Sequence, residues 1–214
     1  MIATEAEARA WLRETLRADG PAMDRLDRLV ALLGEENLRQ NLVSRASLEA
    51  VWRRHIVDSA QLLCHVPRES AVPWLDLGTG AGFPGLVVAA LLPDSEVVLV
   101  ESRARRIEWL QRACDVLDLR KVRIVGDRLE RVASFDARVI SARAFAPLDR
   151  LVEMAARFST SDTLWLLPKG RSAPQELESL RGWNHLFHVE QSLTDPEAGI
   201  VIGRLLGRKG HNQP

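Results

Sequence analysis

Apolar positions in the first part of the chain recur with the spacing of helices. Residues 3–18 and 21–34 each carry apolar side chains every three or four positions, which is typical of amphipathic helices that bury one face. We expect Gly34 to end the second helix, because glycine favours helix termination. A loop over 37–44 then precedes a third helix, for which Ser47 is the predicted N-terminal cap. The chain therefore begins with a helical segment.

From residue 72 onward, short apolar runs alternate with helical segments. The predicted strands are 74–77, 96–100, 122–125, 137–141 and 164–167, followed by two closing strands at 185–191 and 199–206. The predicted helices between them are 84–92, 103–117, 148–158 and 173–180. Repeated strand–helix units are typical of an α/β fold, a parallel sheet with helices on both faces. The last two strands, joined by a turn at Thr194-Asp195-Pro196, predict an antiparallel hairpin at the sheet edge.

The change of pattern divides the chain into three parts. We expect a helical N-terminal extension over 1–66, an α/β domain over 67–209 and a polar tail over 210–214. Of the 214 residues, 46% are hydrophobic, and 29 Lys and Arg balance 29 Asp and Glu. A net charge of zero excludes a globally basic nucleic-acid binder and leaves room for a local basic patch.

The two cysteines and the apolar runs indicate where the protein is found. Cys64 and Cys114 fall in apolar helical patterns and have no Cys or His at metal-ligand spacing, so we expect buried, inert thiols and no metal site. The charged N-terminus is unlike a signal peptide, and the apolar runs are too short to span a bilayer. These features predict an unanchored cytoplasmic protein.

A glycine cluster after the strand at 74–77 is the strongest chemical signal. It reads Asp76-Leu77-Gly78-Thr79-Gly80-Ala81-Gly82-Phe83-Pro84-Gly85. Glycines allow a tight turn and a ligand close to the backbone, and ligands bind at the carboxyl ends of such strands. Residues 80–85 also match the dinucleotide fingerprint. Two features argue against NAD as the ligand. The glycines begin at Gly78, after an acidic strand residue, and the chain is too short for a separate catalytic domain. This form looks like motif I of class I S-adenosylmethionine methyltransferases; a purely structural turn is the alternative.

Two later segments fit a bound nucleoside. Glu101 ends the second strand about twenty residues after the loop, where a carboxylate can accept hydrogen bonds from both ribose hydroxyls of either cofactor. After the third strand, residues 126–130 correspond to the turn that lines the adenine in methyltransferases, with Leu129 against the ring and Glu130 making polar contacts. A surface carboxylate and ordinary helix-start chemistry are the structural alternatives.

The end of the fourth strand should hold the acceptor chemistry. It reads Ser141-Ala142-Arg143-Ala144-Phe145-Ala146-Pro147, without the Asn/Asp-Pro-Pro-Tyr/Phe motif of exocyclic-amine methylation and without a cysteine for attack at cytosine carbon 5. An acceptor that is already nucleophilic remains, such as N7 of guanine, for which catalysis is mostly alignment. Arg143 could hold the cofactor carboxylate or an RNA phosphate, or form a structural salt bridge.

Several segments together resemble the GidB/RsmG family of 16S rRNA guanine-N7 methyltransferases. They are Asn41-Leu42-Val43-Ser44, Arg54-His55-Ile56-Val57-Asp58-Ser59, the glycine cluster, residues 141–146 and Leu167-Pro168-Lys169-Gly170. The resemblance runs from residue 37 to the C-terminus. It implies a class I Rossmann-like fold over 67–209, S-adenosyl-L-methionine as cofactor and a guanine of small-subunit rRNA as substrate. Pro168 and an extra Ala142 depart from the family pattern, and Ala142 could shift the register near Arg143.

The resemblance also implies roles for single residues. Cofactor contacts are implied at Gly78, Phe83, Leu129, Glu130 and Arg143, to which the loop and the strand end add Gly80 and Glu101. His55 and Asp58 share a helix face, which the resemblance places against the cofactor pocket as a positioning pair with Arg143. Arg45, Arg54, Lys169 and Arg171 are candidates for a rim that contacts RNA phosphates, or for a solvated charged face.

The expected partner is 16S rRNA within a small-subunit particle, because a chain of zero net charge is poorly suited to naked RNA; we expect the protein to act as a monomer. A different methyl acceptor and a nucleotide-binding module without catalysis are the alternative functions.

Overall fold

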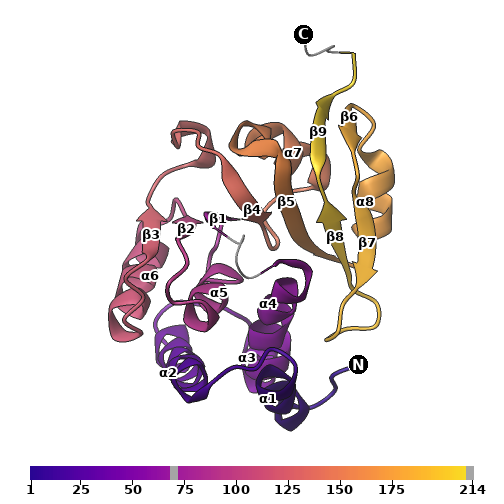
Figure 1. Ribbon diagram of the computed structural model, residues 1–214. Coiled ribbons are helices and arrows are strands. Elements are labelled where there is room, and N and C mark those ends of the chain that lie inside the picture. The colour runs from indigo at the N-terminus through magenta and orange to yellow at the C-terminus, as the bar shows by residue number, and fades with distance from the viewer. Residues whose placement is uncertain (68–71, 211–214) are drawn as a thin grey trace.

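The computed structural model describes residues 1–67 and 72–210. Figure 1 shows a central twisted sheet between helices. In this part of the chain the main sheet has seven strands in the order β3-β2-β1-β4-β5-β8-β7. They are β1 (Trp74–Leu77), β2 (Val97–Val100), β3 (Val122–Val125), β4 (Ala137–Ser141), β5 (Ser159–Gly170), β7 (His188–Gln191) and β8 (Gly199–Gly203). β1 to β5 are parallel, and β8 and β7 add an antiparallel hairpin at the edge, which confirms the predicted fold class.

Helices cover both faces of this sheet, which explains why its central strands read as continuous apolar runs. α5 (Gly85–Leu91) and α6 (Ala104–Val116) pack on one face, and α7 (Leu148–Ala155) and α8 (Ala173–Ser179) on the other. Within β1, Trp74 belongs to the first core cluster and Leu75 to the second, the alternation expected of a strand. Asp76 lies between apolar neighbours in β1 and is itself fully buried.

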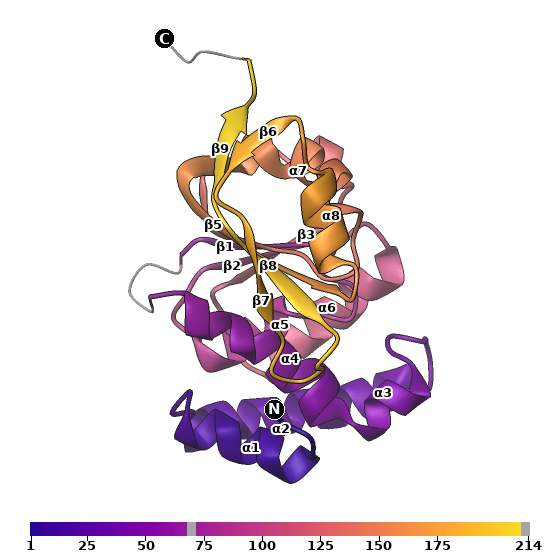
Figure 2. The same cartoon turned by 90° about the vertical axis from the view of Figure 1, so that its right-hand side faces the viewer.

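The N-terminal helices form a layer against the α5 face (Figure 2). They are α1 (Glu5–Glu14), α2 (Gly20–Asn37), α3 (Arg45–Glu49), the π-helical η1 (Trp52–Val57), α4 (Asp58–Ala60) and the 3₁₀-helical η2 (Gln61–His65). Two predicted boundaries are wrong. α2 continues past Gly34 to Asn37, since this glycine keeps helical geometry and costs only about 1 kcal/mol relative to alanine. Ser44, not Ser47, caps α3, because its Oγ accepts the Ser47 N–H at 3.1 Å.

The helical layer and the sheet share one core. Leu12, Leu26 and Leu29 of the layer are fully buried and belong to the same hydrophobic cluster as Leu86 of α5 and Leu110 of α6. Burial of this kind is worth roughly 2 kcal/mol for each leucine side chain. The N-terminal segment is therefore held by the α/β domain, and its last turns are fixed at the edge of the sheet.

The two predicted closing strands each break into two. β7 and β8 stay in the main sheet, whereas β6 (Trp183–His185) and β9 (Leu205–Arg208) form a separate two-stranded sheet at the opposite end of the molecule from the N-terminal helices (Figures 1 and 2). Gly203 makes the break possible: a Cβ there would lie 2.3 Å from the Leu186 carbonyl oxygen, so only glycine fits. Short 3₁₀ turns, η4 (Leu129–Arg131) and η5 (Ala156–Phe158), complete the described elements.

The remaining predictions concern the two cysteines, the polar tail and membrane-spanning helices. Cys64 is exposed, so the prediction of two buried thiols is wrong for it; η2 turns this side chain away from the core. Cys114 is half-buried, and burial beside Asp115 raises its pKa to about 12. Of the predicted polar tail only Gly210 lies within the described residues. No helix of 1–67 or 72–210 has both the length and the apolar character that crossing a membrane requires.

Leu29→Ala tests the shared core. We expect the free energy of unfolding to fall by about 3 kcal/mol, because the truncation leaves a cavity between the helical layer and α5. Urea titrations followed by circular dichroism should show a single transition at lower urea. Leu38→Ala, at a side chain that is 90% exposed, is the control and should stay within about 0.5 kcal/mol of the wild type. Separate unfolding of the helices would contradict a shared core.

Candidate active site

Two cavities adjoin at the carboxyl ends of the parallel strands. The first, which we call the glycine-loop cavity, has a volume of about 390 Å³ and lies between the β1–α5 loop, the end of β2 and the turn after β3. The second, the hairpin cavity, has a volume of about 890 Å³ and lies between η1, the ends of β4 and β5 and the β7–β8 hairpin. Ligand sites in α/β proteins occupy this edge of the sheet.

The glycine loop is shaped by its backbone conformation and by the acid beneath it. Gly78, Gly80 and Gly82 have φ angles of 61°, 60° and 97°, a region that side chains other than glycine rarely adopt. Beneath them, Asp76 accepts hydrogen bonds from the Gly85 N–H at 3.0 Å and from the Ser141 hydroxyl at 2.7 Å. Asp76 thereby joins β1, the start of α5 and the end of β4. Burial raises the pKa of its carboxyl to about 6, against the lowering effect of these donors.

Glu101 forms the next wall of the glycine-loop cavity. Its carboxylate accepts the Gly80 N–H at 3.1 Å and the amides of Ser102 and Arg103 at 2.7 and 2.9 Å. These bonds fix the side chain, which is 8% exposed, at the end of β2 as the sequence predicts. Across the cavity lies Leu129, which is buried.

The turn after β3 only partly matches the sequence prediction. Asp127, Arg128 and Leu129 line the glycine-loop cavity, whereas Glu130 is exposed and lines neither cavity. The 3₁₀ turn η4 explains this difference, because it directs successive side chains to different sides. Asp127 is thus the acidic side chain of this turn that reaches the cavity.

S-adenosylmethionine fits the residues of the glycine-loop cavity. The left-handed glycines leave the backbone bare where a ligand approaches. The fixed Glu101 carboxylate offers acceptors for ribose hydroxyls, and Leu129 offers an apolar surface for an adenine. Within 1–67 and 72–210, no three His, Cys, Asp or Glu side chains gather as a metal would need.

Arg143, Ala144 and Phe145 form a wall that both cavities share. Ala144 adopts a left-handed φ of 52°, which is uncommon outside glycine. This conformation directs Phe145 toward the glycine loop, where a Cβ on Gly78 would lie 2.1 Å from its ring. Contact with Phe145 is therefore a second reason why position 78 admits only glycine. Ser141, the residue before the extra Ala142, pairs with Asp76 at the end of β4.

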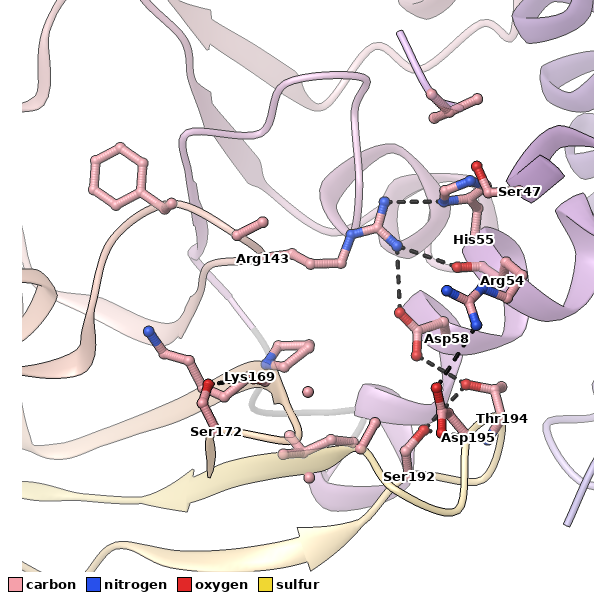
Figure 3. A pocket seen from close by; sticks show the side chains of 18 of the residues that line it. Ser47, Arg54, His55, Asp58, Arg143, Lys169, Ser172, Ser192, Thr194 and Asp195 are labelled. Atoms are coloured by element: carbon pink, nitrogen blue, oxygen red, sulfur yellow. Dashed lines mark hydrogen bonds and ion pairs between the residues drawn. The ribbon is translucent and has the colours of Figure 1, made fainter. Parts of the chain in front are cut away.

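Arg143 is the centre of the wall, and Figure 3 shows its guanidinium directed at η1 and α4. It contacts His55 Nδ1 at 3.1 Å, Asp58 Oδ2 at 3.3 Å and the Arg54 carbonyl oxygen at 3.3 Å. The Phe83 ring lies 5.0 Å below the guanidinium and also stacks on His55 at 5.0 Å. The expected trio of His55, Asp58 and Arg143 thus comes together, with His55 and Asp58 lining the hairpin cavity.

Asp58 is held from its other side by residues that the sequence does not reveal. Its Oδ1 accepts the Thr194 hydroxyl at 3.0 Å and the Gln61 amide at 3.1 Å. Gln61 in turn accepts the Leu193 N–H at 2.8 Å, which ties the β7–β8 hairpin to the helical layer. Thr194 and Leu193 lie more than a hundred positions from Asp58 and Gln61 in the chain, and only the turn at Thr194-Asp195-Pro196 signals them.

His55 is a neutral imidazole in this arrangement. Because the Arg143 guanidinium donates to Nδ1, the ring proton lies on Nε2, which is buried without a partner among the described residues. Burial, with the charges of Arg143 and Arg54, lowers the His55 pKa to about 3. His55 therefore supports Arg143 and has no free basic nitrogen toward a substrate.

The predicted basic rim is neutralised by carboxylates. Arg45 pairs with Glu49 at 3.7 Å, Arg54 with Asp195 at 3.6 Å, Lys169 with Glu176 at 3.0 Å, and Arg171 with Glu197. Lys169 lines the hairpin cavity, but its side chain is only 8% exposed. Its ammonium also donates to the Ala146 carbonyl at 2.5 Å, at the end of the wall that starts with Arg143.

Comparison with known proteins shows the family of this chain. The family model described as rRNA small subunit methyltransferase G matches residues 22–195. The chain belongs to this family. A relative from Novosphingobium aromaticivorans, named ribosomal RNA small subunit methyltransferase G, is 61% identical over 97% of this chain and 91% of its own length. A relative of the same name from Erythrobacter litoralis is 58% identical over 95% of this chain and 98% of its own.

Solved structures with low identity show the same fold. A SAM-dependent methyltransferase from Aquifex aeolicus has a TM-score of 0.57 at 13% identity, over 83% of this chain and 98% of its own. Fibrillarin from Aeropyrum pernix with bound S-adenosyl-L-methionine has a TM-score of 0.54 at 17% identity, over 71% and 75%. This rRNA small subunit methyltransferase G family member is therefore a class I methyltransferase, and the family supports S-adenosylmethionine as its methyl donor.

Asp76→Asn and His55→Gln should change the pH dependence of stability in opposite directions. Between pH 7 and 4 the unfolded chain binds a proton at His55 that the folded protein does not bind, so the free energy of unfolding falls by about 3 kcal/mol. Over the same range the folded protein binds a proton at Asp76 that the unfolded chain does not bind, so the free energy of unfolding rises by about 2 kcal/mol. Relative to wild type, the free energy of unfolding of Asp76→Asn should fall toward pH 4, and that of His55→Gln should rise.

Urea titrations at pH 4, 5, 6 and 7 measure both differences. The double variant is the control: because the two contributions oppose each other, its pH dependence should stay within about 1 kcal/mol of the wild type. Single variants that run parallel to the wild type across this range would show that neither group is perturbed by the fold.

Lys169→Met distinguishes a structural lysine from an RNA-contacting one. We expect the free energy of unfolding to fall by about 2 kcal/mol, because Glu176 is left without its partner beside the wall. Lys169→Met/Glu176→Leu should recover most of this loss in the same urea titrations. Arg171→Met, an exposed residue on the same side, is the control and should stay within about 0.5 kcal/mol. Unchanged stability with weaker substrate binding would favour a phosphate contact.

Proposed function

We propose that this protein transfers the methyl group of S-adenosylmethionine to N7 of a guanine in 16S rRNA. The observation that carries the proposal is the shared wall of Arg143, Ala144 and Phe145, with a nucleoside-sized cavity on each side. One cavity offers the bare glycine backbone and the Glu101 carboxylate to the cofactor, and the other is open to a base. Family membership supports the rRNA substrate.

The site is suited to an acceptor that needs no base. Bound S-adenosylmethionine supplies an electrophilic methyl carbon. The lone pair of guanine N7 forms the new bond as the carbon–sulfur bond breaks, and the positive charge passes from sulfur to the guanine ring with no proton released. His55 is neutral with Nδ1 occupied, and Asp58 is engaged with Arg143 and Thr194. These residues therefore position the wall, and alignment across it is the main catalytic contribution.

The cofactor contacts follow from the glycine-loop cavity. We infer that Gly78, Gly80 and Phe83 lie along the methionine part, Glu101 binds the ribose and Leu129 packs on the adenine. Arg143 is placed to separate the two ligands and to bind the carboxylate of the cofactor or a phosphate of the RNA. Glu130 is assigned only a backbone role, because its side chain lies outside both cavities.

The setting of the reaction follows from the charge of the chain. We infer that the substrate is a small-subunit particle in the cytoplasm, bound by a monomer, because neither the neutral chain nor the paired rim favours naked RNA. Residues 1–66 act as an extension that completes the hairpin cavity, and residues 67–209 as the methyltransferase domain. Protein-free rRNA methylated as fast as assembled subunits would contradict the particle substrate.

Deletion of the gene in its native host tests the function. We expect N7-methylguanine to disappear from one position of 16S rRNA, detected by mass spectrometry of nuclease fragments. A plasmid copy of the wild type should restore the modification. A copy with Gly78→Val should not, because the side chain would meet Phe145 and force a left-handed backbone on valine.

Gly34→Ala is the matched control for this complementation. It changes a glycine in α2 whose added Cβ meets nothing within 4 Å, and it should restore the modification fully. Circular dichroism and calorimetry on the purified Gly78→Val protein separate loss of fold from loss of S-adenosylmethionine binding. An unchanged 16S rRNA modification pattern in the deletion strain would end the assignment.

A further inference from the structure

The four predicted rim cations, Arg45, Arg54, Lys169 and Arg171, are already paired with carboxylates. An RNA-binding surface gains affinity from cations that neutralise phosphates and release counterions. The chain as a whole has no net charge. Parts of the surface where exposed cations lack carboxylate partners are therefore of interest as further RNA contacts.

The two-stranded β6–β9 sheet is such a place. Residues 181–189 and 199–210, which span β6, the first half of β7, β8, β9 and the adjoining turns, contain Arg181, Arg204, Arg208 and Lys209 but no Asp or Glu; Glu190 of β7 is the next acid. Of these cations only Arg208 has an ion-pair partner among the described residues, Glu153. Three of these cations, Arg181, Arg204 and Lys209, are exposed without an ion-pair partner among the described residues, so positive charge accumulates on this sheet.

The same sheet offers a surface for a nucleobase. A depression of about 460 Å³ is lined by Trp183, Asn184, His185, Leu206 and Lys209. The ring of Trp183 and the 45% exposed side chain of Leu206 are apolar, Asn184 has an amide that can pair with a base edge, and Lys209 is exposed beside them. Proteins that bind single-stranded RNA combine aromatic rings, on which bases stack, with cations that pair with phosphates.

His185 and Trp183 are held in place by their neighbours. The His185 ring stacks on Phe187 at 5.1 Å and accepts the Phe187 N–H at 3.2 Å through Nδ1. The Arg208 guanidinium lies 4.8 Å from the Trp183 ring. The rings are therefore ordered before a ligand arrives, which reduces the entropy lost on binding.

We propose that the β6–β9 sheet is a second RNA-binding surface, which holds a single-stranded segment of the rRNA substrate away from the reacting guanine. The proposal rests on the proposed function, which supplies the rRNA. Figures 1 and 2 place this sheet at the opposite end of the molecule from the helical layer that borders the hairpin cavity. A contact so far from the wall stabilises the bound substrate and its transition state equally, so it affects KM and leaves kcat unchanged.

The test is the variant Arg181→Gln/Arg204→Gln/Lys209→Gln, which removes three exposed charges that lack ion-pair partners in the described structure. The first probe is a fluorescein-labelled single-stranded RNA 12-mer of mixed sequence, followed by anisotropy between 50 and 200 mM KCl. We expect the slope of log Kd against log salt to fall by about two to three, since each phosphate contact contributes roughly 0.7 to 0.9. The second probe is methylation of small subunits from the deletion strain, where we expect KM to rise about tenfold with kcat unchanged.

Arg13→Gln/Arg120→Gln/Lys121→Gln is the matched control, with the same loss of charge on α1 and on the turn before β3, at the other sheet edge. It should keep the wild-type salt slope and KM. Equal behaviour of the two triple variants would overturn the proposal, whatever partner the sheet then binds. If the wild type binds the 12-mer through this sheet but methylates no subunits, the proposed function fails and the RNA surface stands.

Discussion

The buried carboxylate of Asp76 is the interaction on which the site depends. A fully buried acid is costly unless hydrogen-bond donors surround it, and here the donors are the Gly85 amide at the start of α5 and the Ser141 hydroxyl at the end of β4. The Gly85 bond ties the far end of the glycine loop back to the strand from which the loop leaves. The loop can only close this short path with left-handed glycines, so its backbone is left bare toward the ligand. The hydrogen bonds that satisfy the buried Asp76 carboxylate therefore also shape the loop of the candidate nucleoside site.

The wall between the cavities depends on two cations in a similar way. Arg143 is held at one end by three acceptors on η1 and α4, and Lys169 holds the Ala146 carbonyl at the other. Between these anchors Ala144 keeps a left-handed conformation that costs roughly 1 kcal/mol on its own. A wall with free ends would relax, and Phe145 would leave Gly78. Lys169, which looks like an RNA contact in the sequence, is here used to maintain shape, which explains why its charge is already paired with Glu176.

The sequence predicts those features of the fold that local patterns of residues determine. The parallel strands, the glycine loop and Glu101 follow from periodicity and spacing, and β1, β3 and β4 have their predicted bounds. What local rules miss depends on contacts distant in the chain. Gly34 does not end α2, the closing strands split where Gly203 passes the Leu186 carbonyl, and Thr194 reaches Asp58 across the fold. Lys169 looks like a surface cation in the sequence, because nothing local shows that Glu176 and the Ala146 carbonyl will enclose it.

Electrostatics gives a reason for separating RNA affinity from chemistry in this molecule. In the proposed reaction a positive charge moves from the glycine-loop cavity to a base in the hairpin cavity. Unpaired arginines around the hairpin cavity would attract phosphates, but they would also oppose the arrival of that charge at close range. Carboxylates such as Asp58 and Asp195 there favour it, and they neutralise the nearby cations in doing so. Under our proposal, cations on the β6–β9 sheet, at the other end of the molecule from the helical layer, supply attraction for RNA away from the reacting base.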